Sequence, residues 1–493
     1  MADSAPRAHE ESPLLAPPGD GDAPSPRLWG RRFTMLLTVE MFLVVLGLAM
    51  VGLPTLRISE DVICRRRMLG VTDEVDEKVC KGMDDVQGEL SFVIAMYSMF
   101  EVVPGLILGF PYGLLADRIG RRPVLALSVL GMSCSVFWCM LVLYNMPSFD
   151  NPRLIWTAHI WLLVGGGKHV LIAMAFCMVA DVEPTEKLSD AFFMIIVSLL
   201  GANLLATFLS AQLMRIDPWI PFILGFGILV LGGLSILFLP ETLHSKPKAA
   251  TDEAEMPEQP SFAAAIKARL ASLLSDVRQS ASLFKSYPVV ALLLTFPTSG
   301  VHSRALEFSA QYVSKSLGWT LSDAGMLLSG QVVLNIALYV LIIPSLSHLL
   351  TSPRMPFRLD PPVKDLVLAR ASGVAIAVGA LLLGLPSAPA AIAGLMIFTL
   401  GLGFAAFCRV VLTALVDASQ TARVYTLISV LSGLGELAAG PAIAWLFKVG
   451  MRMGDDMAGL PYFGVAAFCG AAAVCAFAVS SSALVKRDGV GTA

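Results

Sequence analysis

The sequence predicts an all-α membrane protein in which twelve transmembrane helices form two six-helix bundles. Hydrophobic residues make up 56% of the 493 residues and charged residues only 15%, whereas soluble domains carry about 25% charged residues. Apolar runs of the roughly 20 residues needed to cross a bilayer recur along the chain. One long polar interruption at 243–286 divides them six and six. We therefore expect a monomer embedded in the lipid bilayer, without nucleic acid as a partner.

Each predicted helix is an apolar run long enough to cross the membrane. The runs cover residues 33–57, 90–111, 124–144, 155–180, 188–214, 221–239, 289–313, 324–346, 366–385, 390–416, 425–446 and 462–485. An even number of crossings leaves both termini on one side of the membrane. The Lys and Arg residues of the loops on that side predict that it is the cytoplasm.

The remaining segments complete the predicted organisation. Residues 1–32 form a disordered cytoplasmic tail, because they are rich in Pro, Gly, Asp and Glu, and they lack the apolar core of a cleavable signal peptide. The N-terminal bundle covers 33–242 and the C-terminal bundle 287–485. The linker at 243–286 has apolar residues at helical spacing in its second part, which predicts an amphipathic helix on the inner membrane surface. Residues 486–493 form a second cytoplasmic tail.

The N-terminal tail contains a short pattern typical of sorting signals. Glu10, Leu14 and Leu15 fit an acidic dileucine signal, which adaptor proteins read as an address, as receptors read other targeting tags. The pattern is typical of vacuolar or lysosomal sorting but short enough to recur by chance, so the plasma membrane and the vacuolar membrane both stay open as locations.

Two of the eight cysteines differ from the rest in their surroundings. Cys64 and Cys80 lie in a polar loop that should face an oxidising compartment, so we predict a disulfide between them, with two free thiols as the alternative. The other six lie in apolar runs and are expected to pack as small hydrophobic residues. No cluster of His and Cys has the spacing of a metal site, and we expect no metal and no cofactor.

The motif that organises the chain lies at 113–123, between two runs of spanning length. Its constrained residues are Gly113, Asp117, Arg118, Gly120, Arg121 and Arg122. The stretch resembles the signature loop G-x-L-x-D-R-x-G-R-R of the major facilitator superfamily. The resemblance implies a secondary transporter whose two halves rock about a central site, with this loop as a gate latch. The alternative is a plain turn at the membrane surface that carries cytoplasmic positive charge.

Further stretches narrow the resemblance. They include Gly165-Gly166-Gly167, Gln311-Tyr312-Val313-Ser314-Lys315 and Gly435-Glu436-Leu437-Ala438-Ala439-Gly440-Pro441. Together they look like a fungal group of facilitator proteins related to the animal proton-coupled folate transporters. Drug/proton antiporters of the superfamily usually carry a Gly-Pro motif in helix 5, and the helix at 188–214 lacks it. This departure lowers the expectation of an efflux pump without excluding it.

Charged side chains within the predicted spans are candidates for coupling transport to protons, because charge is costly in the bilayer. The carboxylates proposed for this role are Glu101, Glu436 and Glu40. Burial favours the neutral form of a carboxyl group, and a nearby cation favours the ionised form. A motion that moves Lys168 toward or away from Glu101 would therefore release or load a proton. The alternative for each carboxylate is a static ion pair between helices.

The candidate substrate-binding residues are the remaining polar groups of the spans. They are Lys168, Arg304, Glu307, Arg409, Gln331, Asn335 and Asn203. Pro297 and Gly300 should break the helix just before Arg304, and broken helices mark binding sites in transporters. Ion pairing within a helix and hydrogen bonds between helices are the structural alternatives.

These observations predict a proton-coupled secondary transporter that moves a small organic anion or zwitterion by alternating access. The intramembrane bases favour a negative group on the cargo. The alternative is a proton-driven efflux pump for xenobiotics or secondary metabolites, and a non-transporting sensor is a further possibility. An enzyme is not expected, since no nucleophile, metal or phosphate-binding constellation is present.

Overall fold

The structure is a computed structural model that describes residues 26–68, 76–149, 151–184, 187–242, 286–352, 359–416, 421–454 and 457–480. The sorting signal at Glu10, Leu14 and Leu15, the amphipathic part of the linker and both predicted tails lie outside the described residues, except for 26–32. The described chain is helical throughout. The prediction of an all-α membrane protein is confirmed.

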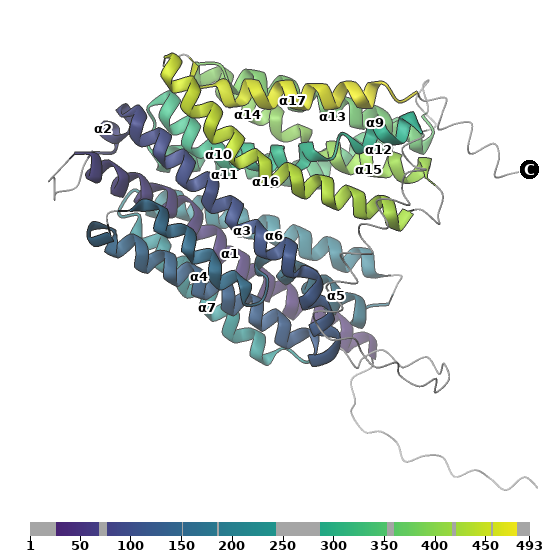
Figure 1. Ribbon diagram of the computed structural model, residues 1–493. Helices are drawn as coiled ribbons and strands as arrows, with labels where there is room; N and C mark the ends of the chain where they lie inside the picture. Colours follow the sequence, from purple (N-terminus) through teal and green to yellow (C-terminus); the bar gives the residue numbers. More distant parts are fainter. Residues whose placement is uncertain are drawn as a thin grey trace, which may run out of the picture.

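The described residues of the N-terminal half form seven α-helices, the 12-residue 3₁₀ segment η1 and the short 3₁₀ segment η3 (Figure 1). They are α1 (Pro26–Arg67), α2 (Glu77–Gly82), α3 (Asp84–Ile119), α4 (Arg121–Phe149), η1 (Pro152–Leu163), α5 (Gly167–Val182), α6 (Leu188–Leu213), α7 (Trp219–Ser235) and η3 (Ile236–Phe238). In this half α1 packs along α6 and α7, and α4 packs against η1 and α5. A hydrophobic core that runs from Phe33 to Leu239 joins them, with Ala310 and Leu321 added from the other half.

The C-terminal half repeats this organisation with more interrupted helices. Its elements are α9 (Tyr287–Leu293), α10 (Pro297–Leu317), α11 (Leu321–Ala337), η5 (Leu338–Ile342), α12 (Ile343–Thr351), α13 (Pro361–Leu383), α14 (Ala388–Leu400), η6 (Gly401–Gly403), α15 (Phe404–Leu415), α16 (Thr421–Met453) and α17 (Leu460–Phe477). Here α13 packs against α14 and α17, and α10 packs along α16. These helices enclose a second hydrophobic core, between Val289 and Val479.

Eleven helices of the described chain are long and apolar enough to cross a membrane. The twelfth predicted span, 289–313, corresponds to α9 and α10. As predicted, this span is broken, because α9 ends at Leu293 and α10 begins at Pro297. The polar residues of α10 leave it less hydrophobic than the other spans.

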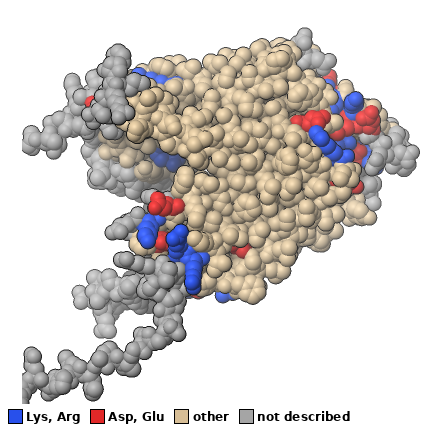
Figure 2. All heavy atoms as spheres, turned by 180° about the vertical axis from the view of Figure 1, so that it is seen from behind, with Lys and Arg blue, Asp and Glu red and all other residues tan. Residues whose placement is uncertain are grey.

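Large apolar side chains cover the outside of the molecule, as expected for a surface that faces lipid. Phe238 is 89% exposed, Ile216 77% and Tyr144 73%. Figure 2 shows that Lys, Arg, Asp and Glu gather at two opposite ends of the face in view, with a broad band free of visible charge between them. Since charge is costly in hydrocarbon, this band marks the depth of the bilayer.

The two halves meet along two pairs of helices, α3 with α16 and α6 with α11. They lie closest near α2, and their helices diverge toward the end from which the chain termini extend (Figure 1). We call the first the disulfide end, because α2 carries Cys80, and the second the latch end, because it holds the 113–123 motif.

Candidate substrate and coupling site

Glycine contacts bring the charge-bearing helices together in the middle of the molecule. A Cβ atom at Gly300 of α10 would lie 2.2 Å from the backbone nitrogen of Glu436, and one at Gly435 of α16 would lie 2.2 Å from the carbonyl oxygen of Pro297. Both positions therefore require glycine, and α10 and α16 touch backbone to backbone. This close contact places Arg304, one turn further along α10, beside Glu436.

A second glycine feature positions α5. The predicted helix at 155–180 is interrupted at Gly165, Gly166 and Gly167, whose φ angles are 84°, 74° and 66°, a region that glycine enters freely. A Cβ atom at Gly165 would lie 2.4 Å from the backbone of Leu127. The break starts α5 anew at Gly167, so that Lys168 lies in its first turn near the centre of the molecule.

Glu101 and Lys168 form an ion pair between α3 and α5. Their carboxylate and ammonium groups lie 3.0 Å apart, and the side chains are 27% and 28% exposed. Behind them is a cavity of about 40 Å³ that Tyr97 and His159 also line. The rings of Tyr97 and His159 contact each other edge to face at 4.1 Å. The pair is thus reached by solvent on one side and supported by aromatic rings on the other.

Arg304 joins two carboxylates on the C-terminal side. Its guanidinium lies 2.8 Å from Glu436 of α16 and 2.5 Å from Glu307 of its own helix. Its side chain is only 3% exposed, whereas Glu436 is 23% and Glu307 53% exposed. A buried guanidinium of this kind needs its carboxylate partners, because unpaired buried charge is strongly destabilising.

The two groups of charges lie on helices of different halves that pack against each other. Glu101 is on α3 and Glu436 on α16, and a Cβ atom at Gly433 of α16 would lie 3.5 Å from the side chain of Leu106 of α3. We call these five residues (Glu101, Lys168, Arg304, Glu307 and Glu436) the central network. With every member ionised, the network holds three negative and two positive charges, and both positive charges already have a carboxylate partner.

The other predicted coupling and binding residues lie apart from the central network. Glu40 is 4% exposed, and its carboxylate accepts a hydrogen bond from Ser235 of α7, so it links α1 to α7 within one bundle. Asn203 donates to the carbonyl oxygen of Leu199 in its own helix at 2.9 Å.

The remaining predicted substrate-binding residues are Gln331 and Asn335 of α11 and Arg409 of α15. Gln331 is 7% exposed, and the buried side-chain oxygen of Asn335 has no hydrogen-bond partner in the described chain. Arg409 is exposed, and the described residues offer it no ion pair. None of the three is joined to the central network by a hydrogen bond or ion pair described here.

The 113–123 motif forms a compact set of contacts at the latch end. Arg121 pairs with Asp117 at 2.8 Å and lies 3.4 Å from Asp181 of α5. Glu241 accepts hydrogen bonds from the backbone nitrogens of Arg121 (2.8 Å) and Arg122 (3.1 Å), and so caps the N-terminus of α4.

Gly120 has to be glycine in this arrangement. Its φ angle is 109°, and a Cβ atom there would lie 2.4 Å from the Glu241 carboxylate. The backbone of Arg118 continues α3 up to this turn, and a Cβ atom at Gly113 would meet no neighbour within 4 Å. The latch contacts described here all lie within the N-terminal half.

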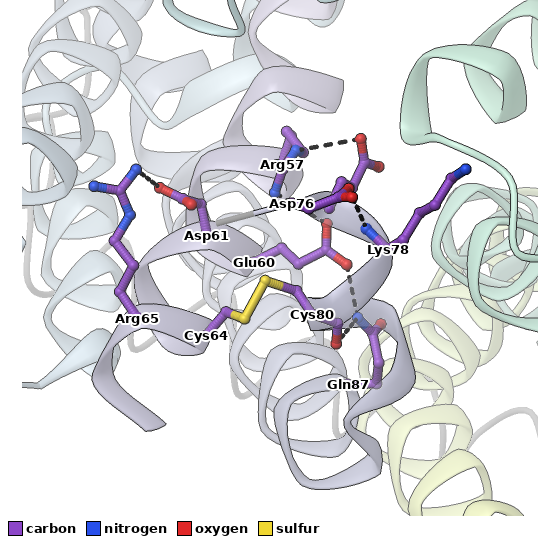
Figure 3. Close-up of a disulfide and its surroundings, with 10 residues drawn as sticks. Arg57, Glu60, Asp61, Cys64, Arg65, Asp76, Lys78, Cys80 and Gln87 are labelled. Carbon is purple, nitrogen blue, oxygen red and sulfur yellow. Dashed lines mark hydrogen bonds and ion pairs between the residues drawn. A yellow bond between two sulfur atoms is a disulfide. The ribbon is translucent and has the colours of Figure 1, made fainter. Parts of the chain in front are cut away.

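The disulfide end holds the predicted bond between Cys64 and Cys80 (Figure 3). The bond joins α1 to the short helix α2, and both cysteines are fully buried. Beside it Glu60, which is 1% exposed, accepts a 2.6 Å hydrogen bond from the side chain of Gln87. The bond therefore holds α2 against the ends of α1 and α3.

From this position α2 reaches the C-terminal half. The carboxylate of Glu77 accepts a hydrogen bond from the backbone nitrogen of Leu321 at 2.8 Å. Lys81 donates to the carbonyl oxygen of Trp319 at 2.5 Å, and Lys315 pairs with Asp84 at 2.8 Å. Arg215, which follows α6, pairs with Asp323 of α11 at 3.1 Å. These contacts close the disulfide end.

Glu77, Lys81 and Lys315 bridge the two halves, a role that the sequence alone does not predict. They lie at or beyond the ends of the apolar runs, where charge is ordinary and carries no signal of its own. Glu77 and Lys81 are four residues apart, which predicts only a local pair on one helix face. Their contacts with α10 and α11 depend on how the two halves pack.

The geometry defines a membrane carrier: two helical bundles, closed at one end, around a charged and partly solvated centre. The Major Facilitator Superfamily profile matches residues 83–441, which is more than half of the chain. The chain therefore belongs to the major facilitator superfamily. It is a secondary transporter with the predicted fold, and not an enzyme.

Known relatives agree with this assignment. The chain is 30% identical to the MFS efflux pump atnC of Emericella nidulans over 486 residues, which are 95% of this chain and 92% of that protein. It is 27% identical to the efflux pump ustT of Aspergillus flavus, over 81% of this chain and 79% of the relative. Among solved structures, a D-xylose–proton symporter superposes with a TM-score of 0.61 over 93% of this chain and 99% of that one. At 14% identity that likeness shows the fold alone.

These relatives correct the narrower resemblance. They are fungal efflux pumps, as their names state, and they do not support a relation to proton-coupled folate transporters. The missing Gly-Pro motif in α6, which lowered the expectation of efflux, therefore carries little weight.

Proposed function

We propose that the protein is a proton-driven efflux pump for xenobiotics or secondary metabolites that are neutral or positively charged. The names of its fungal relatives support export, and these relatives align over most of their own length. The charges of the central network support a neutral or positively charged cargo and the coupling of its transport to protons.

The charge balance of the central network is the observation that carries the proposal. Arg304 is bound by Glu436 and Glu307, and Lys168 is bound by Glu101. An anionic cargo would have to displace one of these carboxylates, whereas a cationic or neutral cargo leaves the pairs in place. Glu307 is 53% exposed, so its carboxylate is the part of the network most accessible to a positive group. Lys168 and Arg304, two of the three bases that favoured an anion or zwitterion, have carboxylate partners, which weakens that preference.

Proton coupling is proposed to act through Glu101 and Lys168. The two residues sit on α3 and α5, which belong to the same bundle but are joined to the rest of it by different contacts. When Lys168 is beside Glu101, its charge favours the ionised carboxylate. When rocking moves Lys168 away, the carboxyl group takes up a proton, because the cation that favoured its ionised form is gone. Proton uptake and cargo release are thereby linked through one ion pair.

The direction of transport follows from the proposed orientation. The basic residues Arg118, Arg121 and Arg122 favour the cytoplasm for the latch end. In the state described here the disulfide end is closed, so cargo would reach the central network from the cytoplasm. Export then requires that the contacts of α2 with α10 and α11 open.

Accumulation in cells tests the direction and the cargo charge together. Yeast that lack their own multidrug pumps would express the protein and be given three labelled probes: cationic tetraphenylphosphonium, neutral progesterone and anionic benzoate. We expect lower steady-state levels of the cation and the neutral probe than in cells with an empty vector. A protonophore should abolish the difference, because the proton gradient drives export. Benzoate should be unaffected.

Glu89→Gln is the matched control for substitutions in the network. Glu89 lies on α3, as Glu101 does, but at the disulfide end beside Arg66 and Arg67. This variant should export both probes normally. Selective lowering of benzoate, or higher levels of the cation in expressing cells, would overturn the proposal in favour of an anion carrier or an importer.

A further inference from the structure

A second cavity lies within the C-terminal half, apart from the central network. It has a volume of about 140 Å³, and its lining includes Thr298, Ser299, His302, Ser303, Phe404 and Ala405. We call it the α10 pocket. It lies beside two interrupted helices: α10 begins at Pro297 after the break that follows α9, and the turn of η6 (Gly401–Gly403) separates α14 from α15. Interrupted helices of this kind form binding sites in other transporters.

The α10 pocket and Glu307 lie along one face of α10. Ser299, Ser303 and Glu307 recur every four residues and so share this face of the helix. Ser303 lines the pocket and is exposed, and Glu307 is 53% exposed. One molecule could therefore contact both places, which lie one helical turn, or about 6 Å, apart.

The polar groups of the pocket are arranged to accept hydrogen bonds. The hydroxyl groups of Thr298, Ser299 and Ser303 each donate to a carbonyl oxygen of the preceding turn. Their protons are thus engaged, and their remaining lone pairs point outward as acceptors. No charged side chain is among the residues that line the pocket.

His302 adds a buried polar side chain without hydrogen-bond partners among the described residues. It is only 3% exposed, yet neither ring nitrogen has a hydrogen-bond partner in the described chain. One face of its ring stacks on Phe398 at 4.1 Å and an angle of 12°, which fixes its orientation. Buried polar groups without partners are rare and costly, so a molecule that enters the pocket gains by supplying the missing bond.

We propose that the α10 pocket is a subsite for the uncharged, hydrogen-bond-donating part of the cargo, such as a phenolic hydroxyl group. The proposal rests on the proposed function, because it places the positive part of the same cargo at Glu307. The volume is below the roughly 300 Å³ of a pocket for a drug-sized ligand. It therefore suits one ring or a short hydroxylated chain and not a whole cargo molecule.

Binding of matched amines to the purified full-length protein in lipid nanodiscs tests the proposal. Tyramine and phenethylamine carry the same ammonium group and differ by one phenolic hydroxyl, and 4-methoxyphenethylamine can accept but not donate there. Isothermal titration should show that tyramine binds about fivefold more tightly than the other two, the gain typical of one neutral hydrogen bond. No proton gradient is present, so the result is independent of coupling and of direction.

A neutral pair separates failure of the pocket from failure of the proposed function. p-Cresol and 4-methylanisole have no amine, so their relative binding reports on the α10 pocket alone. If the amines fail to bind while p-cresol still binds more tightly than 4-methylanisole, the cationic cargo is wrong and the pocket stands. If neither pair shows a preference for the donor, the pocket proposal is wrong.

Substitutions in the α10 pocket test whether the preference for a hydrogen-bond donor arises there. Ala405→Leu fills the pocket with apolar atoms and should abolish the preference for tyramine, and Ser303→Ala should reduce it. Thr351→Ala is the matched control, because the hydroxyl of Thr351 also bonds to a carbonyl one turn back, but near the end of α12. If Ala405→Leu still prefers tyramine, the phenolic hydroxyl group binds outside the α10 pocket. If that variant does not fold, the comparison of ligands on the unaltered protein still decides.

Discussion

The disulfide end and the latch end use the same types of charged residue in opposite ways. At the disulfide end, Glu77, Lys81 and Lys315 connect the N-terminal half to the C-terminal half. At the latch end, Arg121 and Glu241 have the described contacts with residues of their own half. The molecule is held shut where charges bridge the halves, and the halves diverge at the end where the described charge contacts lie within the N-terminal half (Figure 1).

The comparison also shows what must change during transport. Opening the disulfide end requires the loss of several bridging hydrogen bonds, and closing the latch end requires new contacts that bridge the halves there. The central network lies between the two ends and is made of residues from both halves. It is the natural place to link the binding of a proton or a cargo molecule to the exchange of one set of contacts for the other.

The largest effect is expected for Glu101→Gln, in the network between the two ends. Glutamine retains the shape but has no ionisable group, so the variant should lose all gradient-driven transport. It should still exchange cargo across the membrane, because the rocking motion does not require a proton. Counterflow of labelled tetraphenylphosphonium in proteoliposomes measures exchange, and an imposed pH gradient measures accumulation. Retained accumulation would show that the proton carrier lies elsewhere, with Glu436 the next candidate.

A smaller but clear effect is expected for Glu77→Ala at the disulfide end. The variant loses the bond to Leu321 and leaves the nearly buried Lys81 without its carboxylate. Hydrogen bonds to charged groups contribute about 1.5–3 kcal/mol, so the closed state should become at least about tenfold less favoured. Electron-spin distances between labels on unnatural amino acids at Asn151 and Arg452 would report the opening.

Asp85→Ala is the control for this measurement. Asp85 is exposed and lies in the first turn of α3, so its loss should leave the distance distribution unchanged. An unchanged distribution in Glu77→Ala as well would mean that packing of α3 on α16, and not the polar bridge, holds this end closed.

A local effect is expected when the disulfide is removed. The bond closes a loop with a sequence separation of 16, and loops of this length contribute about 3 kcal/mol by restricting the unfolded chain. In the variant with Cys64→Ser and Cys80→Ser, the amides of α2 should exchange up to about a hundredfold faster. Hydrogen exchange resolved by mass spectrometry would measure this, with α17 as the internal reference. If the amides of α2 exchange at the same rate with and without the disulfide, the other contacts of α2 are enough to hold it in place.

The smallest effect is expected for Asp117→Asn at the latch end. Asp117 is 58% exposed and pairs only with Arg121 of the next helix among the contacts described here. Exposed ion pairs contribute about 0–1 kcal/mol, so the initial rate of transport should change by less than about fivefold. A loss as complete as that of Glu101→Gln would mean that Asp117 makes a bridging contact when the latch end is closed.

The sequence predicted the parts of the site that depend on local pattern. The break before α10 follows from Pro297, and the interruption before α5 coincides with the triplet Gly165–Gly167 that the sequence analysis singled out. The pairing of Glu101 with Lys168 was weighed as an alternative because two opposite charges in neighbouring spans have few other partners. The linkage of Arg304 to Glu436 was not predicted, since these residues are 132 positions apart.

Composition and spacing alone determined the class of this protein, because a bilayer excludes charge and demands helices that satisfy their own backbone hydrogen bonds. The same constraints located the break in α10, the disulfide and the charged candidates. Only the tertiary structure decided which charges neutralise one another, which end is closed, and that Lys168 and Arg304 are paired. Those properties depend on distances of a few ångströms between residues far apart in the chain, and the linear order of residues does not specify them.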